Sequence, residues 1–220
     1  MNVKVAKKAI IEGFHRTDDS LLQEDLYRSQ DTNLQHLKSI MPSLVLLFID
    51  MFHVVVANAG DAKAVLARST STDDEVPVVD TKSLLKAIVL TREHKAIFPQ
   101  ERSRIQKFNS YPGGSVGPNG RLQGRIEVSR ALGDRHFKKV GLIATPDVHS
   151  FELTKKDHFI ILGSDGLWGV FGPSDAVEFV QKQLKETFSA TLAVRCLVKE
   201  AVRERRCKDN CTAVLIIFKH

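Results

Sequence analysis

Three aspartates lie beside short apolar runs that are typical of β-strands. Asp61 lies in HVVVANAGDAKAVLAR, Asp165 follows HFIILGS, and Asp209 precedes NCTAVLIIF. Taken singly, each is an ordinary turn residue, because Asp, Asn and Gly favour turns. Together, carboxylates delivered by strand ends to one edge of a sheet repel one another unless a cation lies among them. Oxygen ligands of this kind suit Mg²⁺ or Mn²⁺, so the three aspartates predict a divalent-metal site.

A glycine-rich stretch is the next candidate for chemistry. Gly114, Gly117 and Gly120 lie three residues apart. This spacing is neither a dinucleotide-binding fingerprint nor a phosphate-binding Walker loop, and no Lys-Ser/Thr pair follows it. We therefore expect a connection between strands at 109–120, where Gly and Pro are frequent.

The three cysteines, Cys196, Cys207 and Cys211, make an odd number and fall in the last quarter of the chain. A secreted disulfide scaffold would be richer in cysteine, so the count favours a reducing compartment. No further Cys or His completes a zinc-binding set around them. We expect small buried or half-buried thiols.

Apolar, β-branched runs recur between Leu44 and Phe218 and position these residues. The runs are LVLLFI (44–49), HVVVAN (53–58), AVLAR (64–68), KAIVL (86–90), GRIEVS (124–129), HFIILG (158–163) and CTAVLIIF (211–218). Each has the length of a strand. Because most follow one another without a helical crossover, the pattern predicts an α+β fold with antiparallel sheets and helices outside. An acidic, polar connection is expected at 69–80.

Helical periodicity appears in three places. An amphipathic helix is predicted at 5–14, ending near Gly13, and 15–39 is expected to be a loop with some helix. A second helix is introduced by Pro173 and Ser174. A third is predicted from about Ala190 to Arg205.

Composition limits the class of protein. The chain has 220 residues, 43% of them hydrophobic and 26% charged, which is ordinary for a globular protein. The net charge of +6 suits an anionic partner without identifying one. The most apolar stretch, 40–57, contains Pro42, Asp50 and His53, so no membrane span is expected. No secretion signal is recognisable, and an intracellular protein of the cytoplasm or nucleus is predicted.

Several motifs, taken in order, resemble those of the type 2C protein phosphatases. They are VVVANAGDAKAVLAR, LTREHKAIFPQERSRIQKF, GRLQGRIEVSRALGDRHFKK, ATPDV, IILGSDGLWGVF and CKDNCTAVLIIF. The resemblance runs from about Val54 to Phe218 and is strongest to the plant branch. It divides the chain into an atypical segment, 1–53, and a portion of the catalytic domain, 54–220. It implies two packed antiparallel sheets flanked by helices.

The resemblance also implies a chemistry and roles for residues. These enzymes hydrolyse phosphoserine and phosphothreonine with a water activated by two Mg²⁺ or Mn²⁺ ions. It assigns Asp165 and Asp209 to the metal shell and Asp61 to a third, weaker metal site. Asn210 and Gly166 support the two ligands. Arg130 and Asp134, from SRALGD, are interpreted as structural.

One expected motif is absent from these 220 residues. The family's Asp-Gly-His-Gly stretch, which supplies a bridging Asp and an acidic His, does not occur, and neither does its phosphate-binding Arg. The chain resembles a member that begins too late, so no catalytic residue is assigned. Weak metal binding and little phosphatase activity are expected.

Two alternative functions remain open. A non-catalytic protein could keep the fold and bind phosphoproteins. A nucleic-acid binder could use the RERRCK cluster (203–208), but these cations close a predicted helix, where they favour its dipole. Phosphorylated proteins are therefore the expected partners, with neither nucleic acid nor membrane, and the oligomeric state is left open.

Overall fold

A computed structural model of the chain describes residues 2–30, 43–50, 52–70, 85–108 and 113–219. Most of the predicted acidic connection at 69–80 and part of the Gly/Pro loop at 109–120 lie outside these residues. The chain divides into two compact units. Unit 1 comprises residues 1–47, 55–61 and 93–149, and unit 2 comprises 48–54, 62–92 and 150–220.

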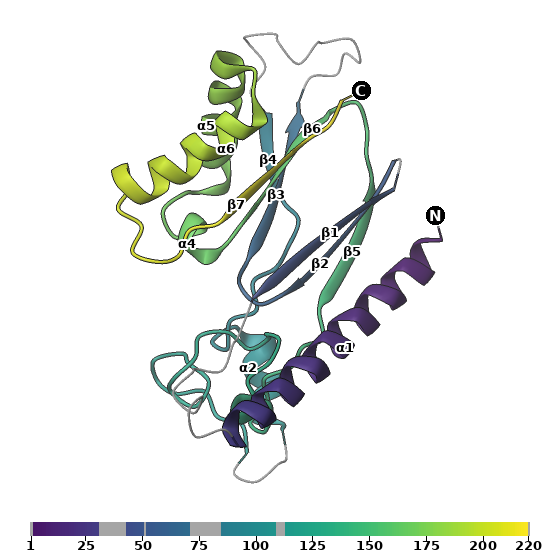
Figure 1. Ribbon diagram of the computed structural model, residues 1–220, viewed down its shortest axis with the longest axis vertical. Helices are drawn as coiled ribbons and strands as arrows, with labels where there is room; N and C mark the ends of the chain where they lie inside the picture. Colours follow the sequence, from purple (N-terminus) through teal and green to yellow (C-terminus); the bar gives the residue numbers. More distant parts are fainter. Residues whose placement is uncertain (1, 31–42, 51, 71–84, 109–112, 220) are drawn as a thin grey trace. The chain divides into compact units, whose positions relative to one another are not determined.

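Unit 2 is built on a four-stranded antiparallel sheet (Figure 1). Its order is β4–β3–β6–β7, with β3 at Lys63–Ser69, β4 at Leu85–Val89, β6 at Asp157–Gly163 and β7 at Ala213–Ile217. β3 and β6 are the central strands, and most of their residues are buried. These are the apolar, β-branched runs that the sequence predicted as strands.

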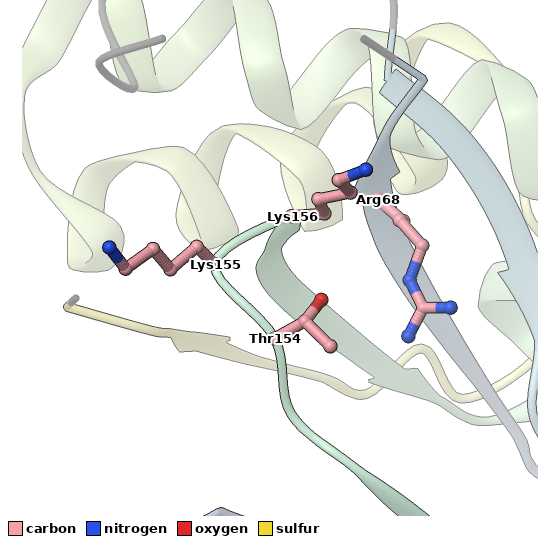
Figure 2. A pocket seen from close by; sticks show the side chains of 4 residues that line it. All are labelled: Arg68, Thr154, Lys155 and Lys156. Carbon is pink, nitrogen blue, oxygen red and sulfur yellow. The ribbon is translucent and has the colours of Figure 1, made fainter. Parts of the chain in front are cut away.

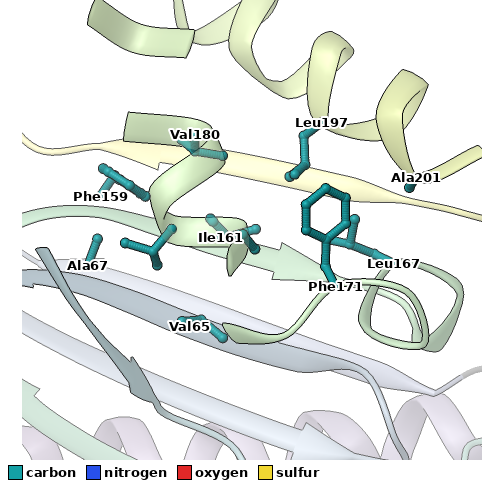
Figure 3. Close-up of a cluster of buried hydrophobic side chains, with 11 residues drawn as sticks. Val65, Ala67, Phe159, Ile161, Leu167, Phe171, Val180, Leu197 and Ala201 are labelled. Atoms are coloured by element: carbon teal, nitrogen blue, oxygen red, sulfur yellow. The ribbon is translucent and has the colours of Figure 1, made fainter. Parts of the chain in front are cut away.

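Helices cover one face of this sheet. α4 (Asp165–Trp168) follows β6 directly, α5 (Pro173–Thr187) contacts β3 and β4, and α6 (Ala190–Lys199) contacts β7. α6 continues as a short π-helix, η1, at Glu200–Glu204. Figure 3 shows the core, in which Phe159 and Ile161 of β6 face Val180 of α5 and Leu197 of α6.

Unit 1 contains the helices α1 (Val3–Gln30), α2 (Pro99–Gln106) and α3 (Arg135–Lys138). One hydrophobic cluster joins Phe14 of α1 to Ala57, Ala59, Leu132 and Ala144, and another surrounds Ile105 of α2. α1 is also held by Asp18, which accepts from the Gly133 backbone N–H at 2.7 Å and pairs with Lys138 Nζ at 2.8 Å.

A second sheet has three strands in the order β1–β2–β5, with β1 at Leu44–Asp50, β2 at His53–Ala59 and β5 at Asp147–Glu152. The predicted α+β class, antiparallel sheets with helices outside, is confirmed. None of the helices within the described ranges is both long and apolar enough to cross a bilayer.

Two predicted elements differ from the structure, and one strand of the structure was not predicted. The first helix does not end near Gly13 but continues to Gln30. Gly13 is exposed there, and its helical backbone costs only about 1 kcal/mol relative to alanine. The run GRIEVS (124–129) is not a strand: it makes only isolated bridges, while Ile126 and Val128 pack against the cluster around Ile105. β5 was not predicted, because its sequence, DVHSFE, alternates weakly.

Candidate functional site

Asp165 lies where β6 ends and α4 begins. Its side chain is exposed, and its Oδ1 accepts a hydrogen bond from the Gly166 backbone N–H at 2.9 Å. Trp168 fixes the short helix to the sheet, because its indole N–H lies 3.1 Å from both the Lys63 and the Gly163 carbonyl oxygens. The carboxylate is therefore presented to solvent by a rigid strand end.

Asp209 lies in the segment that leads into β7, and it is also exposed. Its Oδ1 accepts from the Asn210 backbone N–H at 2.7 Å. The predicted supporting residue Asn210 thus orients this carboxylate with its main chain. Gly166 gives the same kind of support to Asp165.

The pairing of β6 with β7 brings these two segments together. Gly163 lies opposite Ala213 in the antiparallel register, so the end of β6 and the start of β7 are neighbours. Ser164 Oγ donates to the Asn210 carbonyl at 2.9 Å and accepts from the Thr212 N–H at 3.1 Å. The structure therefore places the Asp165 and Asp209 segments side by side.

Gly166 is required at this junction for a steric reason. A Cβ at this position would lie 2.4 Å from the Asn210 carbonyl oxygen. Cys207 also contacts Gly166, because its thiol donates to the Gly166 carbonyl at 3.0 Å. All three cysteines are free and half-buried, which confirms the expectation from the sequence.

Asp61 belongs to unit 1, on the turn after β2. Ser43 Oγ donates to its Oδ1 at 2.8 Å. The preceding Gly60 has φ +118°, and a Cβ there would lie 2.1 Å from Ser43 Oγ, so only glycine fits this turn. The assignment of Asp61 to a third, weaker metal site stays a prediction; Asp165 and Asp209 belong to unit 2.

His94 holds the turn that carries Asp61. Its backbone N–H donates to the Gly60 carbonyl at 2.9 Å, and its Nδ1 accepts from the Gly60 N–H at 3.3 Å. Its Nε2 lies 3.1 Å from Asp147 Oδ2. Burial lowers the pKa of His94 and the nearby Arg130 charge lowers it further, although Asp147 opposes both. A neutral imidazole is the form that accepts at Nδ1.

A buried ionic network lies next to His94. Arg130 donates to both Glu101 and Asp147, the shortest distance being 2.6 Å from its Nη2 to Glu101 Oε1. Burial alone would raise the pKa of Glu101, but hydrogen bonds from Arg130, Arg104 and Ser129 outweigh it and lower that pKa to about 2. The structural interpretation of Arg130 agrees with these contacts.

Asp134 is structural as well. It has a left-handed backbone, with φ 54°, and its side chain accepts from the Phe137 N–H at 3.2 Å, so it caps α3. The sequence did not reveal the role of Glu101. Its only signal was its position within the family-like motif LTREHKAIFPQERSRIQKF.

The donor chemistry of this region fits a hard divalent cation only in part. Asp165 and Asp209 offer exposed carboxylate oxygens of the kind that Mg²⁺ and Mn²⁺ prefer. Within the described ranges, however, no group of three or more His, Cys, Asp or Glu side chains could hold an ion. Metal binding by Asp165 and Asp209 therefore stays a prediction.

Known proteins resemble this chain in sequence and in fold. The family model for protein phosphatase 2C matches residues 2–211. The match is thus wider than the range from Val54 over which motifs were recognised. A probable protein phosphatase 2C 67 from Oryza sativa subsp. japonica is 76% identical over the whole chain, and a probable protein phosphatase 2C 8 from Arabidopsis thaliana is 59% identical.

The chain spans 57% and 59% of the lengths of these two relatives. Among solved structures, a serine-threonine phosphatase 2C from Toxoplasma gondii superposes with a TM-score of 0.77 at 24% identity. That superposition covers 98% of this chain and 68% of the other. At this identity the likeness concerns the fold, and it agrees with the sheets and helices described above. By its sequence match and its fold, the chain belongs to the protein phosphatase 2C family.

Proposed function

We propose that this protein is a metal-dependent serine/threonine phosphatase, which hydrolyses phosphoserine and phosphothreonine in intracellular signalling proteins. The observation that carries the proposal is that the segments of Asp165 and Asp209 lie side by side. Both carboxylates are exposed at neighbouring strand ends, and both lie in motifs of the family to which the chain belongs. Residues 54–220 contribute this part of the catalytic domain.

Asp165 and Asp209 are the proposed ligands of Mg²⁺ or Mn²⁺, and Asp61 is the proposed ligand of a further, weaker ion. A divalent ion held there supplies Lewis acidity, which activates water toward phosphorus. The protein's own contribution is orientation. The Gly166 and Asn210 N–H groups fix the two carboxylates, and the absence of a Cβ at Gly166 lets their segments approach.

We expect slow turnover by these 220 residues. Two carboxylates would leave most of the coordination of an ion to water, and the sequence contains no Asp-Gly-His-Gly stretch. Hydrolysis of a phosphoserine peptide by the full chain should be measurable with Mn²⁺ and abolished by EDTA. Asp165→Asn and Asp209→Asn should each remove it, by at least about tenfold, because each takes away a ligand charge.

Glu178→Gln is the matched control, because this exposed carboxylate lies on α5 of the same unit. Its hydrolysis rate should equal that of the unchanged chain. Rapid, EDTA-sensitive turnover that Asp165→Asn abolishes would contradict the expectation of slow activity. EDTA-resistant hydrolysis that survives both substitutions would contradict the metal-dependent proposal itself.

A second candidate is a non-catalytic phosphoprotein-binding protein. The incomplete ligand set among the described residues favours it. It predicts that a phosphoserine peptide binds the chain and is recovered intact after prolonged incubation with Mn²⁺.

A further inference from the structure

A basic pocket lies in unit 2, in a region that the proposed phosphatase chemistry does not use. It is lined by Arg68, Thr154, Lys155 and Lys156 (Figure 2). Arg68 is near the end of β3, and the other three residues belong to the turn that precedes β6. Three of the four lining residues are cations, so the pocket is suited to an anion.

The pocket and Asp165 are at opposite ends of the same sheet. In the antiparallel register of β3 and β6, Lys63 pairs with Gly163, whereas Arg68 pairs with Asp157. Five residues of extended strand separate Lys63 from Arg68, which corresponds to about 17 Å. A ligand in this pocket would therefore occupy a place distinct from the acidic pair.

A buried aspartate holds the pocket in shape. The side chain of Asp157 is fully buried, and its two oxygens accept from Arg68 Nε at 2.6 Å and from Arg68 Nη2 at 3.1 Å. The same carboxylate accepts from the N–H and the hydroxyl of Thr154. The guanidinium is thus fixed in orientation before any ligand arrives, which reduces the entropy cost of binding.

Backbone hydrogen bonds make the turn rigid as well. The Asp157 N–H donates to the Thr154 carbonyl at 3.0 Å, and the Ser69 N–H donates to the Lys156 carbonyl at 2.8 Å. Both lysines are therefore carried by a turn that is tied to β3. Figure 2 shows Lys155 extending in a different direction from Arg68. Because Lys155 is exposed, its long side chain is able to turn toward a bound anion.

The charges of these residues define the ligand. Among the described residues, Asp157 pairs with Arg68 and leaves the two lysine charges, about +2, which match a phosphoryl dianion. Within the described part of the chain, Arg68 Nη1 has no hydrogen-bond partner, so it is available as a donor together with the two ammonium groups. The Thr154 hydroxyl proton is already donated to Asp157.

From this geometry we propose that the pocket is a non-catalytic binding site for the phosphoryl group of a phosphorylated peptide. The site would hold a second phosphate of a protein that carries more than one. Binding there needs no divalent ion, since all of the donors are cationic side chains. It goes beyond the proposed phosphatase function and can be tested without turnover.

The test measures binding of a fluorescent phosphoserine peptide to the full chain by anisotropy, with EDTA present so that no metal contributes. Lys155→Gln combined with Lys156→Gln should weaken binding about tenfold. Arg68 is left unchanged, because its removal would strand the buried charge of Asp157. Raising NaCl from about 50 mM to about 500 mM should also weaken binding, since exposed charges are screened.

The matched control is Lys182→Gln combined with Lys199→Gln. These lysines are exposed on α5 and α6 of the same unit and change the net charge by the same amount. Binding by this control should stay within about twofold of the unchanged chain. Equal losses in the two double variants would show attraction to overall charge and overturn the proposal, as would an unchanged affinity in the pocket variant.

Two further arms identify the ligand chemistry on the unchanged chain, where folding of a variant plays no part. Excess inorganic phosphate should displace the phosphoserine peptide, and the same peptide without phosphate should not bind measurably. Equal binding of the phosphate-free peptide would overturn the proposal. Because hydrolysis is not measured, failure here leaves the proposed phosphatase function standing, and loss of hydrolysis leaves this site standing.

Discussion

At the scale of single residues, the buried ion pair between Glu101 and Arg130 dominates unit 1. The two side chains are 5% and 11% exposed, so each charge depends on the other. Glu101→Gln would leave the guanidinium of Arg130 with Asp147 as its remaining carboxylate, and Arg104 would lose the ion pair that it makes with Glu101. We expect this substitution to lower the free energy of unfolding, measured in urea, by about 3 kcal/mol.

Glu127→Gln is the control for this prediction. Glu127 pairs with Lys95 and Arg121, but its side chain is 43% exposed. Solvent screens such a pair, so its loss should cost less than about 1 kcal/mol. Equal effects of the two substitutions would contradict the importance given to the buried network.

The same residue predicts how stability depends on pH. The pKa of Glu101 is about 2 in the fold and 4.5 when unperturbed, so between these values the unfolded chain binds more protons. The stabilisation is therefore complete above about pH 4.5 and is lost as the pH falls toward 2, in total by about 3 kcal/mol. Urea unfolding at a series of pH values should show this loss. Glu101→Gln should flatten the curve in that window.

At the scale of elements, the helix α1 continues past Gly13, where the sequence predicted its end, and this continuity can be tested. Gly13 lies within the helix, and a Cβ there would meet no atom within 4 Å. Gly13→Ala should raise the free energy of unfolding by about 0.5 to 1 kcal/mol, because alanine loses less backbone entropy than glycine when the chain folds. Gly60→Ala is the contrasting control and should destabilise, because it combines positive φ with a clash at Ser43. Destabilisation by Gly13→Ala would contradict the continuous helix.

The elements show what could be predicted from the sequence and why the rest could not. Strands such as β3 and β6 are buried apolar runs, and such runs can be recognised from their composition alone. The expectation that Asp165 and Asp209 act together came from two strand ends and a family resemblance, and the structure shows that their segments are neighbours. GRIEVS also has the composition of a strand, but its apolar residues pack into a hydrophobic cluster instead. Strand propensity alone does not predict such packing.

Long-range contacts account for what the sequence did not show at the candidate site. Glu101, Arg130 and Asp147 are separated by up to 46 positions in the chain and meet only in the folded unit. The hydrogen bond between His94 and Gly60 likewise joins residues that are far apart in the sequence. Residues of this kind have no periodicity that a sequence pattern could detect.

At the scale of the whole molecule, each unit has hydrophobic clusters of its own. In unit 2 the cluster includes Leu197, and in unit 1 one cluster includes Ile105, both with side chains that are fully buried. A unit with its own core can unfold as a cooperative block with its own free energy. We therefore expect calorimetry of the full chain to resolve two transitions.

Two matched core truncations assign those transitions. Leu197→Ala and Ile105→Ala each remove a buried aliphatic side chain and should each cost about 2 to 5 kcal/mol, because the cavity left behind does not fully close. If the units unfold separately, Leu197→Ala lowers the melting temperature of one transition and Ile105→Ala lowers that of the other. A single transition that both variants shift equally would show that the chain unfolds as one block, and the division into separately stable units would be wrong.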